Sequence, residues 1–135
     1  MILSLSEIDK LSQELQELYP SGGIILLQGD LASGKTTFVK NFTKFIGLSC
    51  EVSSPTFSIM NSYDDKIFHY DIYNNSTTKF IESGLLENLE LEGYHFIEWA
   101  DEKFEEILKT YGFRYTTINI TPTNDNKREY KLCTN

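Results

Sequence analysis

The 135-residue sequence predicts a single α/β domain, in which a mixed parallel and antiparallel sheet lies between layers of helices. Three observations support this fold class. Short apolar runs typical of buried strands alternate with amphipathic helical segments. Two pairs of strand-like runs joined by short polar turns add antiparallel hairpins. No repeat, low-complexity stretch or linker interrupts residues 1–135, so one domain is expected.

The chain begins with a predicted helix and a predicted strand. Ser4 and Glu7 have the spacing of a capping box, which marks a helix start. One face of this helix carries the apolar side chains Ile8, Leu11, Leu15 and Leu18. The Pro-Ser-Gly-Gly sequence at residues 20–23 ends the helix. The apolar run at 24–27 then predicts a buried strand.

A second helix follows over residues 35–46, with apolar side chains at helical spacing, and Gly47 ends it. The remaining elements are shorter. The patterns predict strands at 50–52, 57–63, 66–73, 94–97, 114–121 and 127–133, and helices at 78–83, 85–91 and 101–111. Asp64-Asp65 joins one hairpin, and residues 124–126 join the last.

Residues 29–36 match the phosphate-binding pattern G-x-x-x-x-G-K-[ST], the P-loop. Backbone N–H groups of such a loop and of the following helix surround nucleotide phosphates. Lys35 would reach the β- and γ-phosphates, and the Thr36 hydroxyl would bind Mg²⁺. The alternative is an ordinary Gly-Lys turn. The predicted nucleotide-binding residues are Gly29, Asp30, Leu31, Ala32, Ser33, Gly34, Lys35, Thr36 and Thr37, which makes the fold a three-layer P-loop NTPase-like domain.

Two acidic residues follow apolar strands and are candidates for the chemistry. Asp71 follows residues 67–70, and Glu98 follows residues 94–97. Acids at the carboxyl ends of such strands lie beside the crevice where nucleotides bind. Either can hold Mg²⁺ or polarise water, and the pattern does not divide these roles between them. The alternative for each is an exposed acid at a strand end.

Other polar and aromatic residues have weaker signals. Residues 54–57 read Ser-Pro-Thr-Phe, a rigid loop where GTPases keep a γ-phosphate sensor, so Thr56 is a candidate nucleotide contact. A plain Ser-Pro turn is the alternative. His69 and His95 alternate with apolar residues and are interpreted as core or surface histidines. Trp99 is assigned to the core, with base stacking and partner docking as alternatives.

Composition restricts the function classes. The net charge of −8, from 12 basic and 20 acidic side chains, argues against tight direct nucleic-acid binding by this chain alone. An acidic surface suits a basic partner or simply confers solubility. No apolar run is long enough to cross a bilayer, and no signal peptide is recognised. Cys50 and Cys133 lack metal-ligand spacing and are expected to be free thiols in a reducing cytoplasm.

Together these segments resemble the TsaE family, the small ATPase subunit of the bacterial machinery that makes threonylcarbamoyl-adenosine in tRNA. The resemblance spans nearly the whole chain and rests on residues 29–38, 54–57, 69–73 and 97–99. It implies an ATPase that joins TsaB and TsaD, of which TsaD transfers the threonylcarbamoyl group to the adenosine beside the anticodon. The subunit's hydrolysis of ATP would reset the transferase between turnovers.

The resemblance also assigns roles to residues. By similarity, Thr36 and Glu98 would hold Mg²⁺, Lys35 the phosphates, and Asp71 would support hydrolysis. The first helix near Glu7 and the last hairpin near Lys127 and Arg128 would flank the base.

The sequence departs from the family pattern at three places. Where the family has Gly-Ala-Gly-Lys, this chain has Ala32-Ser33-Gly34-Lys35, and Ala32 is tolerated there if its φ is negative. Asn74 replaces an arginine, so this chain lacks the cation that would make a salt bridge or a partner contact there. Ala100 and Asp101 replace a Pro-Glu pair. None of these changes is expected to remove the ATP site.

Three functions are compatible with these residues. The first is a Mg-dependent ATPase that is slow alone and depends on partners, because no arginine finger is evident. The second is a small-molecule kinase, although 135 residues leave little room for a lid and a substrate domain. The third is a nucleotide-gated binding module in which hydrolysis is incidental.

Overall fold

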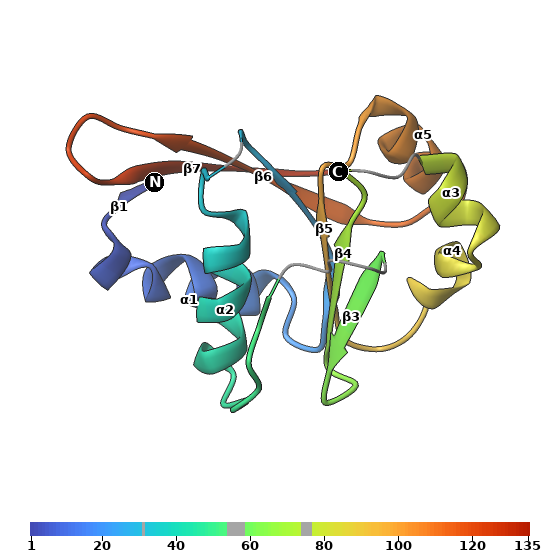
Figure 1. Cartoon of the computed structure of the whole chain (residues 1–135), viewed down its shortest axis with the longest axis horizontal. Coiled ribbons are helices and arrows are strands. Elements are labelled where there is room, and N and C mark those ends of the chain that lie inside the picture. Colours follow the sequence, from blue (N-terminus) through green and yellow to red (C-terminus); the bar gives the residue numbers. More distant parts are fainter. Residues whose placement is uncertain (31, 54–58, 74–76) are drawn as a thin grey trace.

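The computed structural model describes residues 1–30, 32–53, 59–73 and 77–135. Its strands are β1 (Ile2–Leu3), β2 (Gly23–Gln28), β3 (Met60–Tyr63), β4 (Ile67–Asp71), β5 (Tyr94–Glu98), β6 (Tyr115–Pro122) and β7 (Arg128–Thr134). They form one sheet in the order β1-β7-β6-β2-β5-β4-β3 (Figure 1). β2 runs parallel to β5 and β6, and β4 runs parallel to β5. The other neighbours are antiparallel, so the predicted mixed sheet is confirmed.

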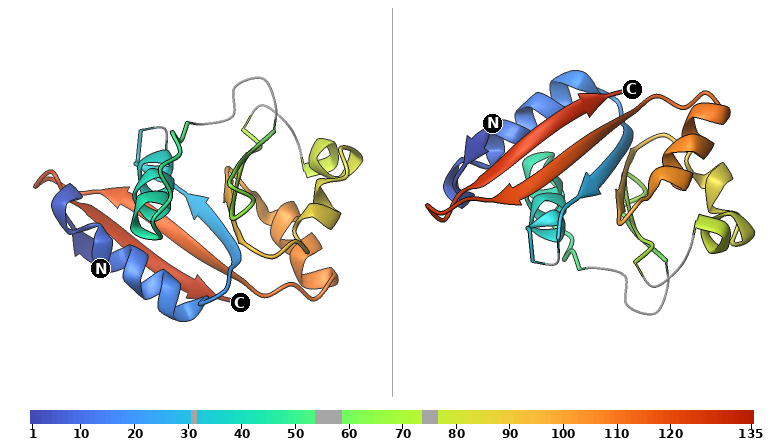
Figure 2. Two further views of the ribbon diagram at one scale, coloured as in Figure 1. Left: turned by 90° about the horizontal axis from the view of Figure 1, so that it is seen from below. Right: turned by 90° about the horizontal axis from the view of Figure 1, so that it is seen from above.

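Helices cover both faces of this sheet (Figure 2). The helices are α1 (Asp9–Leu18), α2 (Lys35–Phe45), α3 (Thr77–Glu82), α4 (Leu85–Asn88) and α5 (Glu102–Thr110). α1 and α2 pack on one face, and the other three pack on the opposite face. The predicted three-layer arrangement is therefore confirmed, with boundaries that differ by a few residues.

Local sequence signals explain several element ends. Glu7 accepts hydrogen bonds from the backbone N–H and the hydroxyl of Ser4, which closes a 3-10 turn before α1. Asp64 and Asp65 both have left-handed φ values, +55° and +52°, as the tight turn of the β3–β4 hairpin requires. Gly47 follows α2 with a φ of +90°, where the sequence predicts the helix to stop.

Two elements differ from the prediction. β1 pairs with β7 over only two residues, which is too short to produce a periodic pattern in the sequence. The expected strand at 50–52 is wrong, because these residues have no regular secondary structure. Val52 is nevertheless buried in the core. The backbone of Ser53 bonds through its N–H and C=O to the Tyr63 hydroxyl, a side-chain partner that replaces strand pairing.

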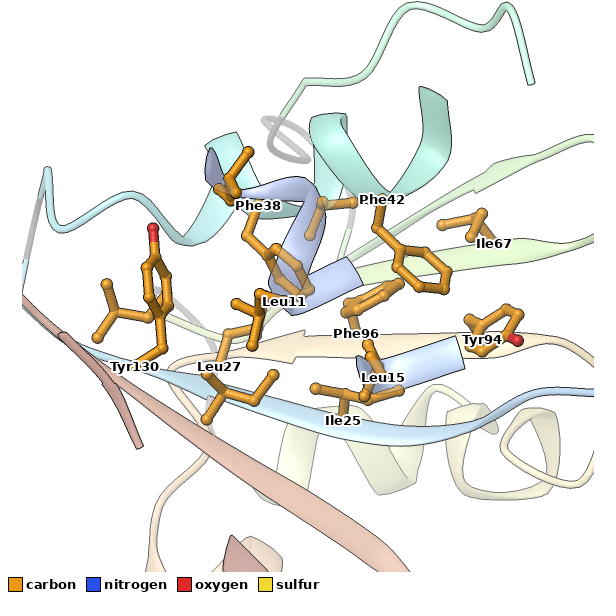
Figure 3. Close-up of a cluster of buried hydrophobic side chains, with 14 of the residues drawn as sticks. Leu11, Leu15, Ile25, Leu27, Phe38, Phe42, Ile67, Tyr94, Phe96 and Tyr130 are labelled. Carbon is orange, nitrogen blue, oxygen red and sulfur yellow. The ribbon is translucent and has the colours of Figure 1, made fainter. Parts of the chain in front are cut away.

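A buried aromatic cluster fixes α2 on the sheet. The Phe42 ring centroid lies 4.7 Å from that of Tyr94 and 5.4 Å from that of Phe96 (Figure 3). Phe38, one turn earlier on α2, meets Phe96 edge-on at 6.0 Å. Edge-to-face rings add to the burial energy and restrict sliding. The cluster therefore fixes the first turn of α2 relative to the ends of β2 and β5.

Two further expectations concern cysteines and membranes. Cys50 and Cys133 are both free and exposed, as the sequence analysis expects. None of the helices in the described part of the chain has the length and apolar content that a bilayer crossing requires.

Candidate functional site

The P-loop connects the carboxyl end of β2 to the first turn of α2. The carboxyl ends of β4 and β5 lie at the same edge, because both strands run parallel to β2 through the sheet. Asp71 and Glu98, the last residues of β4 and β5, are register partners. The structure thus brings together the loop and the two acids that the sequence analysis singled out.

A pocket of about 440 Å³ opens at this edge. Its size falls within the range of small-ligand sites. It is lined by Ala32, Ser33, Gly34, Lys35, Thr36, Thr37, Asp71, Glu98, Trp99 and Arg128. Most predicted site residues therefore share one pocket.

Lys35 is the buried cation of this pocket. Its ammonium group donates hydrogen bonds to the backbone carbonyls of Gly29 and Asp30, the second at 3.2 Å. It also lies 3.7 Å from the centre of the Trp99 ring, a cation–π contact. Burial lowers the pKa of Lys35, and the negative charges of Glu98, Asp71 and Asp30 oppose that shift. The amine is thus held where phosphate oxygens could replace the loop carbonyls.

Glu98 is a buried carboxylate with two partners. Its Oε2 atom accepts a hydrogen bond from the Thr36 hydroxyl at 3.0 Å. The same oxygen bonds to Nε2 of His69, a fully buried residue of β4. Only 3% of Glu98 is exposed, so these two contacts fix its side chain.

Asp71 occupies a more open position beside Glu98. Its Oδ1 accepts a hydrogen bond from the backbone N–H of Tyr73 at 2.9 Å. Partial burial raises the pKa of Asp71, and the neighbouring charge of Glu98 raises it further. This carboxylate therefore binds a proton more readily than an ordinary exposed aspartate.

The core assignments of His69 and Trp99 are confirmed, but the sequence analysis missed the contact of His69 with Glu98 and the place of Trp99 at the pocket. His69 lies two residues before Asp71, so both side chains project from the same face of β4, and this period of two was the available signal. Trp99 packs partly against the core, but it also lines the pocket and meets the Tyr73 ring at a tilt of 50°, with ring centroids 4.6 Å apart. Its φ of +68° is not encoded by any local sequence signal.

The interpretation of His95 as a core histidine is confirmed. It is buried on the opposite face of the sheet, where Nδ1 bonds to the Tyr70 hydroxyl and Nε2 to the Leu91 carbonyl. Its two ring nitrogens are satisfied by the core. Burial lowers the pKa of His95.

Ala32 does not meet the condition of a negative φ. Ala32 has a φ of +62°, in the left-handed region that favours glycine. The loop keeps its curvature at this position at the cost of local strain. At Gly34 φ is +107°, which strains any other residue, and an added Cβ would lie 3.0 Å from Nε of Arg128, so the arginine side chain would have to shift.

Arg128 lies closer to the loop than its neighbour Lys127. Arg128 is half-buried and lines the pocket, and its Nε has no hydrogen-bond partner among the described residues. The structure therefore places an arginine at the pocket, although no arginine finger was evident from the sequence.

The remaining predicted site residues lie elsewhere. Lys127 is exposed in the β6–β7 turn, and Glu7 takes part in the cap before α1. Neither lines the pocket as the structure describes it, so their nucleotide roles stay predictions. Leu31, Thr56 with the rest of loop 54–57, and Asn74 lie outside the described residues.

Comparisons with known proteins agree with this architecture. The family model for the threonylcarbamoyl adenosine biosynthesis protein TsaE matches residues 2–130. Curated relatives carry the name tRNA threonylcarbamoyladenosine biosynthesis protein TsaE. The Bacillus subtilis relative is 38% identical over 111 residues, covering 74% of this chain and 70% of that protein. The Treponema pallidum relative is 33% identical over 116 residues, with 83% and 82% covered.

Partial matches and a solved structure complete the comparison. The Synechocystis relative is 41% identical over 76 residues, a match that spans about half of that protein, 48%. The crystal structure of YdiB from Bacillus subtilis superposes with a TM-score of 0.66 at 25% identity, covering 99% of this chain and 84% of YdiB. The chain belongs to the TsaE family of tRNA threonylcarbamoyladenosine biosynthesis proteins.

Proposed function

We propose that this TsaE-family protein binds ATP together with Mg²⁺ and hydrolyses it. The observation that carries the proposal is the position of Thr36 and Glu98, whose oxygens lie 3.0 Å apart at the start of α2 beside Lys35. A hydroxyl, a carboxylate and an amine meet at the N-terminus of this helix, which is the donor set that a Mg-bound triphosphate requires.

The loop and two cations support phosphate binding. The backbone N–H groups at the start of α2 favour anions, since helix N-termini carry partial positive charge. Lys35 would exchange the carbonyls of Gly29 and Asp30 for phosphate oxygens. Arg128 borders Gly34 and adds a second cation at the same wall. These positive groups would offset the three to four negative charges of ATP.

The residues present fit a magnesium ion. Neighbouring oxygen ligands of octahedral Mg²⁺, with bonds of about 2.1 Å, lie about 3 Å apart, as the Thr36 and Glu98 oxygens do. No described group of three or more His, Cys, Asp or Glu side chains could hold a metal by itself. The nucleotide phosphates would therefore complete the coordination. When bound, the ion neutralises phosphate charge and acts as a Lewis acid.

We assign Glu98 to the metal and Asp71 to the attacking water. Glu98 is fixed by Thr36 and His69, as a metal ligand should be. Asp71 is more open, and burial raises the pKa of its carboxyl, so it accepts a proton more readily than an ordinary aspartate does. In this role Asp71 would orient the water and take up its proton.

The relatives' names support a place in tRNA modification. These proteins are named for the biosynthesis of threonylcarbamoyladenosine in tRNA, and we propose that this chain serves the same pathway in the cytoplasm. TsaB and TsaD are the proposed partners. The net charge of −8 suits contact with basic protein surfaces more than direct contact with tRNA.

Replacing Glu98 with glutamine tests the proposal, because glutamine keeps the volume and removes the charge. ATP should still bind, while phosphate release and threonylcarbamoyladenosine formation in tRNA should both fall. Glu102→Gln, on the exposed start of α5, is the matched control and should leave both unchanged.

The same assay separates the alternatives. If tRNA modification continues at the normal rate without hydrolysis, the nucleotide-gated binding module is the better description. If phosphate appears on a small molecule instead of in solution, the protein is a kinase. Unchanged hydrolysis in Glu98→Gln would remove Glu98 from the reaction.

A further inference from the structure

We propose that His69 is a positioning residue, which holds the Glu98 carboxylate in the orientation that binds the metal ion. This inference rests on the proposed Mg-dependent function. It concerns a residue that neither the loop nor the strand-end acids would identify. Its basis is one buried contact, between Nε2 of His69 and Oε2 of Glu98.

The contact crosses two adjacent parallel strands. His69 is the register partner of Phe96 on β5, two residues before Glu98, so both side chains leave the same face of the sheet. His69 is 0% exposed and Glu98 3% exposed. Water therefore cannot replace the ring as a partner of the carboxylate. The side-chain conformation of Glu98 is determined from within the core.

The protonation pattern of the contact can be deduced from its partners. An ionised carboxylate only accepts hydrogen bonds, so Nε2 of His69 is the donor. Nδ1 of the same ring is buried and has no partner among the described residues. A proton on Nδ1 would be an unpaired buried donor, which is costly. Nε2 is therefore the nitrogen that carries the proton in this contact.

The contact is more than a satisfied pair in the core. Oε2 of Glu98 accepts from His69 on its inner side and from the Thr36 hydroxyl on the pocket side. Thr36 is the residue expected to turn toward the metal ion. When it does, His69 remains to hold the carboxylate in place. Hydrogen bonds to ligating carboxylates characteristically tune metal affinity in this way.

His95 provides a matched internal control. It is the only other histidine of the chain, lies on the neighbouring strand and is equally buried. Its partners are Tyr70 and Leu91, on the face of the sheet away from the pocket. A general effect of losing a buried histidine should appear at both positions, whereas a positioning effect should appear at His69 alone.

The experiment measures how much Mg²⁺ is needed for tight binding of ADP. Trp99 is the single tryptophan and lines the pocket, so its fluorescence reports nucleotide binding. His69→Phe keeps a ring and removes the donor. It should bind ADP in EDTA as the wild type does, but need roughly 10- to 100-fold more Mg²⁺ for the metal-dependent increase in affinity. His95→Phe should need the wild-type concentration.

Two amide variants test the position of the donor. Glutamine places an N–H near the position of Nε2, and asparagine places one near Nδ1. His69→Gln should recover most of the Mg²⁺ response, and His69→Asn should not. The comparison of these two variants tests the positioning role even if His69→Phe does not fold. In the wild type, the Nε2 proton of His69 should give an NMR signal that exchanges slowly and shifts when Mg²⁺ and ADP are added.

The outcomes separate this inference from the proposed function. If the wild type binds ADP with Mg²⁺ and all three His69 variants need the same Mg²⁺ concentration as the wild type, the positioning role is wrong and the proposed function stands. Equal responses of the Gln and Asn variants would also overturn it. If the wild type shows no Mg²⁺-dependent nucleotide binding, the proposed function and this inference fail together.

Discussion

At position 32 an alanine occupies a backbone conformation that glycine adopts more easily. Its φ is +62°, and a left-handed conformation costs an L-residue roughly 1–2 kcal/mol. Ala32→Gly relieves this strain but also increases the freedom of the unfolded chain, which costs about 0.5–1 kcal/mol. We expect a net gain of up to about 1.5 kcal/mol in the free energy of unfolding, measured with urea.

Ala100 is the matched control, since it is the other alanine of the chain and its φ is not positive. Ala100→Gly should destabilise the protein by about 0.5–1 kcal/mol. A loss of stability in Ala32→Gly comparable with that of the control would contradict the left-handed assignment.

Asp71 gives a prediction about pH and stability. Burial raises the pKa of its carboxyl in the folded state, so the folded protein binds this proton more tightly than the unfolded chain does. The charged form therefore opposes folding above the raised pKa, and this penalty disappears as the pH falls through it to the ordinary range. Asp71→Asn should be at least as stable as the wild type at pH 7, and should lose this advantage in acid.

Urea unfolding of the wild type and of Asp71→Asn at pH 7 and pH 4 measures their difference in stability. The rate of phosphate release from ATP measures their activity. Asp71→Asn should lose turnover despite its stability. The contradicting result is a variant whose stability, compared with that of the wild type, is lower at pH 7 than at pH 4. It would show that the charged Asp71 carboxylate stabilises the fold.

Which single residues could be predicted depends on where their constraints originate. Lys35, Thr36, Asp71 and Glu98 follow from a loop pattern and from the rule that strand ends meet at one edge. Trp99 and Ala32 depend on backbone conformations set by tertiary contacts, so no local signal indicates them. The role of His69 requires knowing that β4 and β5 are adjacent and in register, which the sequence does not state.

On the scale of elements, the packing of α2 on the sheet supports the P-loop. Phe42 is fully buried and its ring contacts those of Tyr94 and Phe96. Phe42→Ala should lower the free energy of unfolding by about 3–5 kcal/mol, because it removes the ring and leaves a cavity. Lys40→Ala, on the exposed side of the same helix, should change it by less than about 0.5 kcal/mol. Equal effects in urea unfolding would contradict this packing.

Element prediction succeeded where a local pattern and the tertiary structure agree. Both hairpins and the two main helices have strong periodicity or turn residues, and they form as predicted. The strand expected at 50–52 does not form, and the backbone of the next residue, Ser53, bonds to the Tyr63 hydroxyl and not to a neighbouring strand. β1 was missed because two residues carry no pattern, although β7 gives them a partner.

On the scale of the whole molecule, the strand order creates the site and was not available from the sequence. β2 lies between β5 and β6, so the P-loop opens beside Glu98 on one side and beside the β6–β7 hairpin, with Arg128, on the other. Segments distant in the chain, the P-loop with α2 and the strands β4, β5 and β7, thus supply groups to one pocket. Charge and composition restricted the function class but did not indicate this arrangement.

The proposed dependence on partners is also a property of the whole molecule. Mixing the protein with TsaB and TsaD should raise the rate of phosphate release, because a partner surface can order a pocket that is open on its own. The rate with each partner alone is the control. A rate that is unchanged in the full mixture, while the proteins co-purify, would contradict partner activation.

The central claim is that the P-loop holds Mg-bound ATP through Lys35. Lys35→Ala removes the ammonium group between the loop carbonyls and the Trp99 ring, and Lys40→Ala removes an exposed one from the same helix. Calorimetric titration measures the affinity of each variant for Mg-ATP. The claim predicts a loss of affinity of 10-fold or more, about 1.4 kcal/mol, for Lys35→Ala alone. Wild-type affinity in a folded Lys35→Ala protein would contradict it.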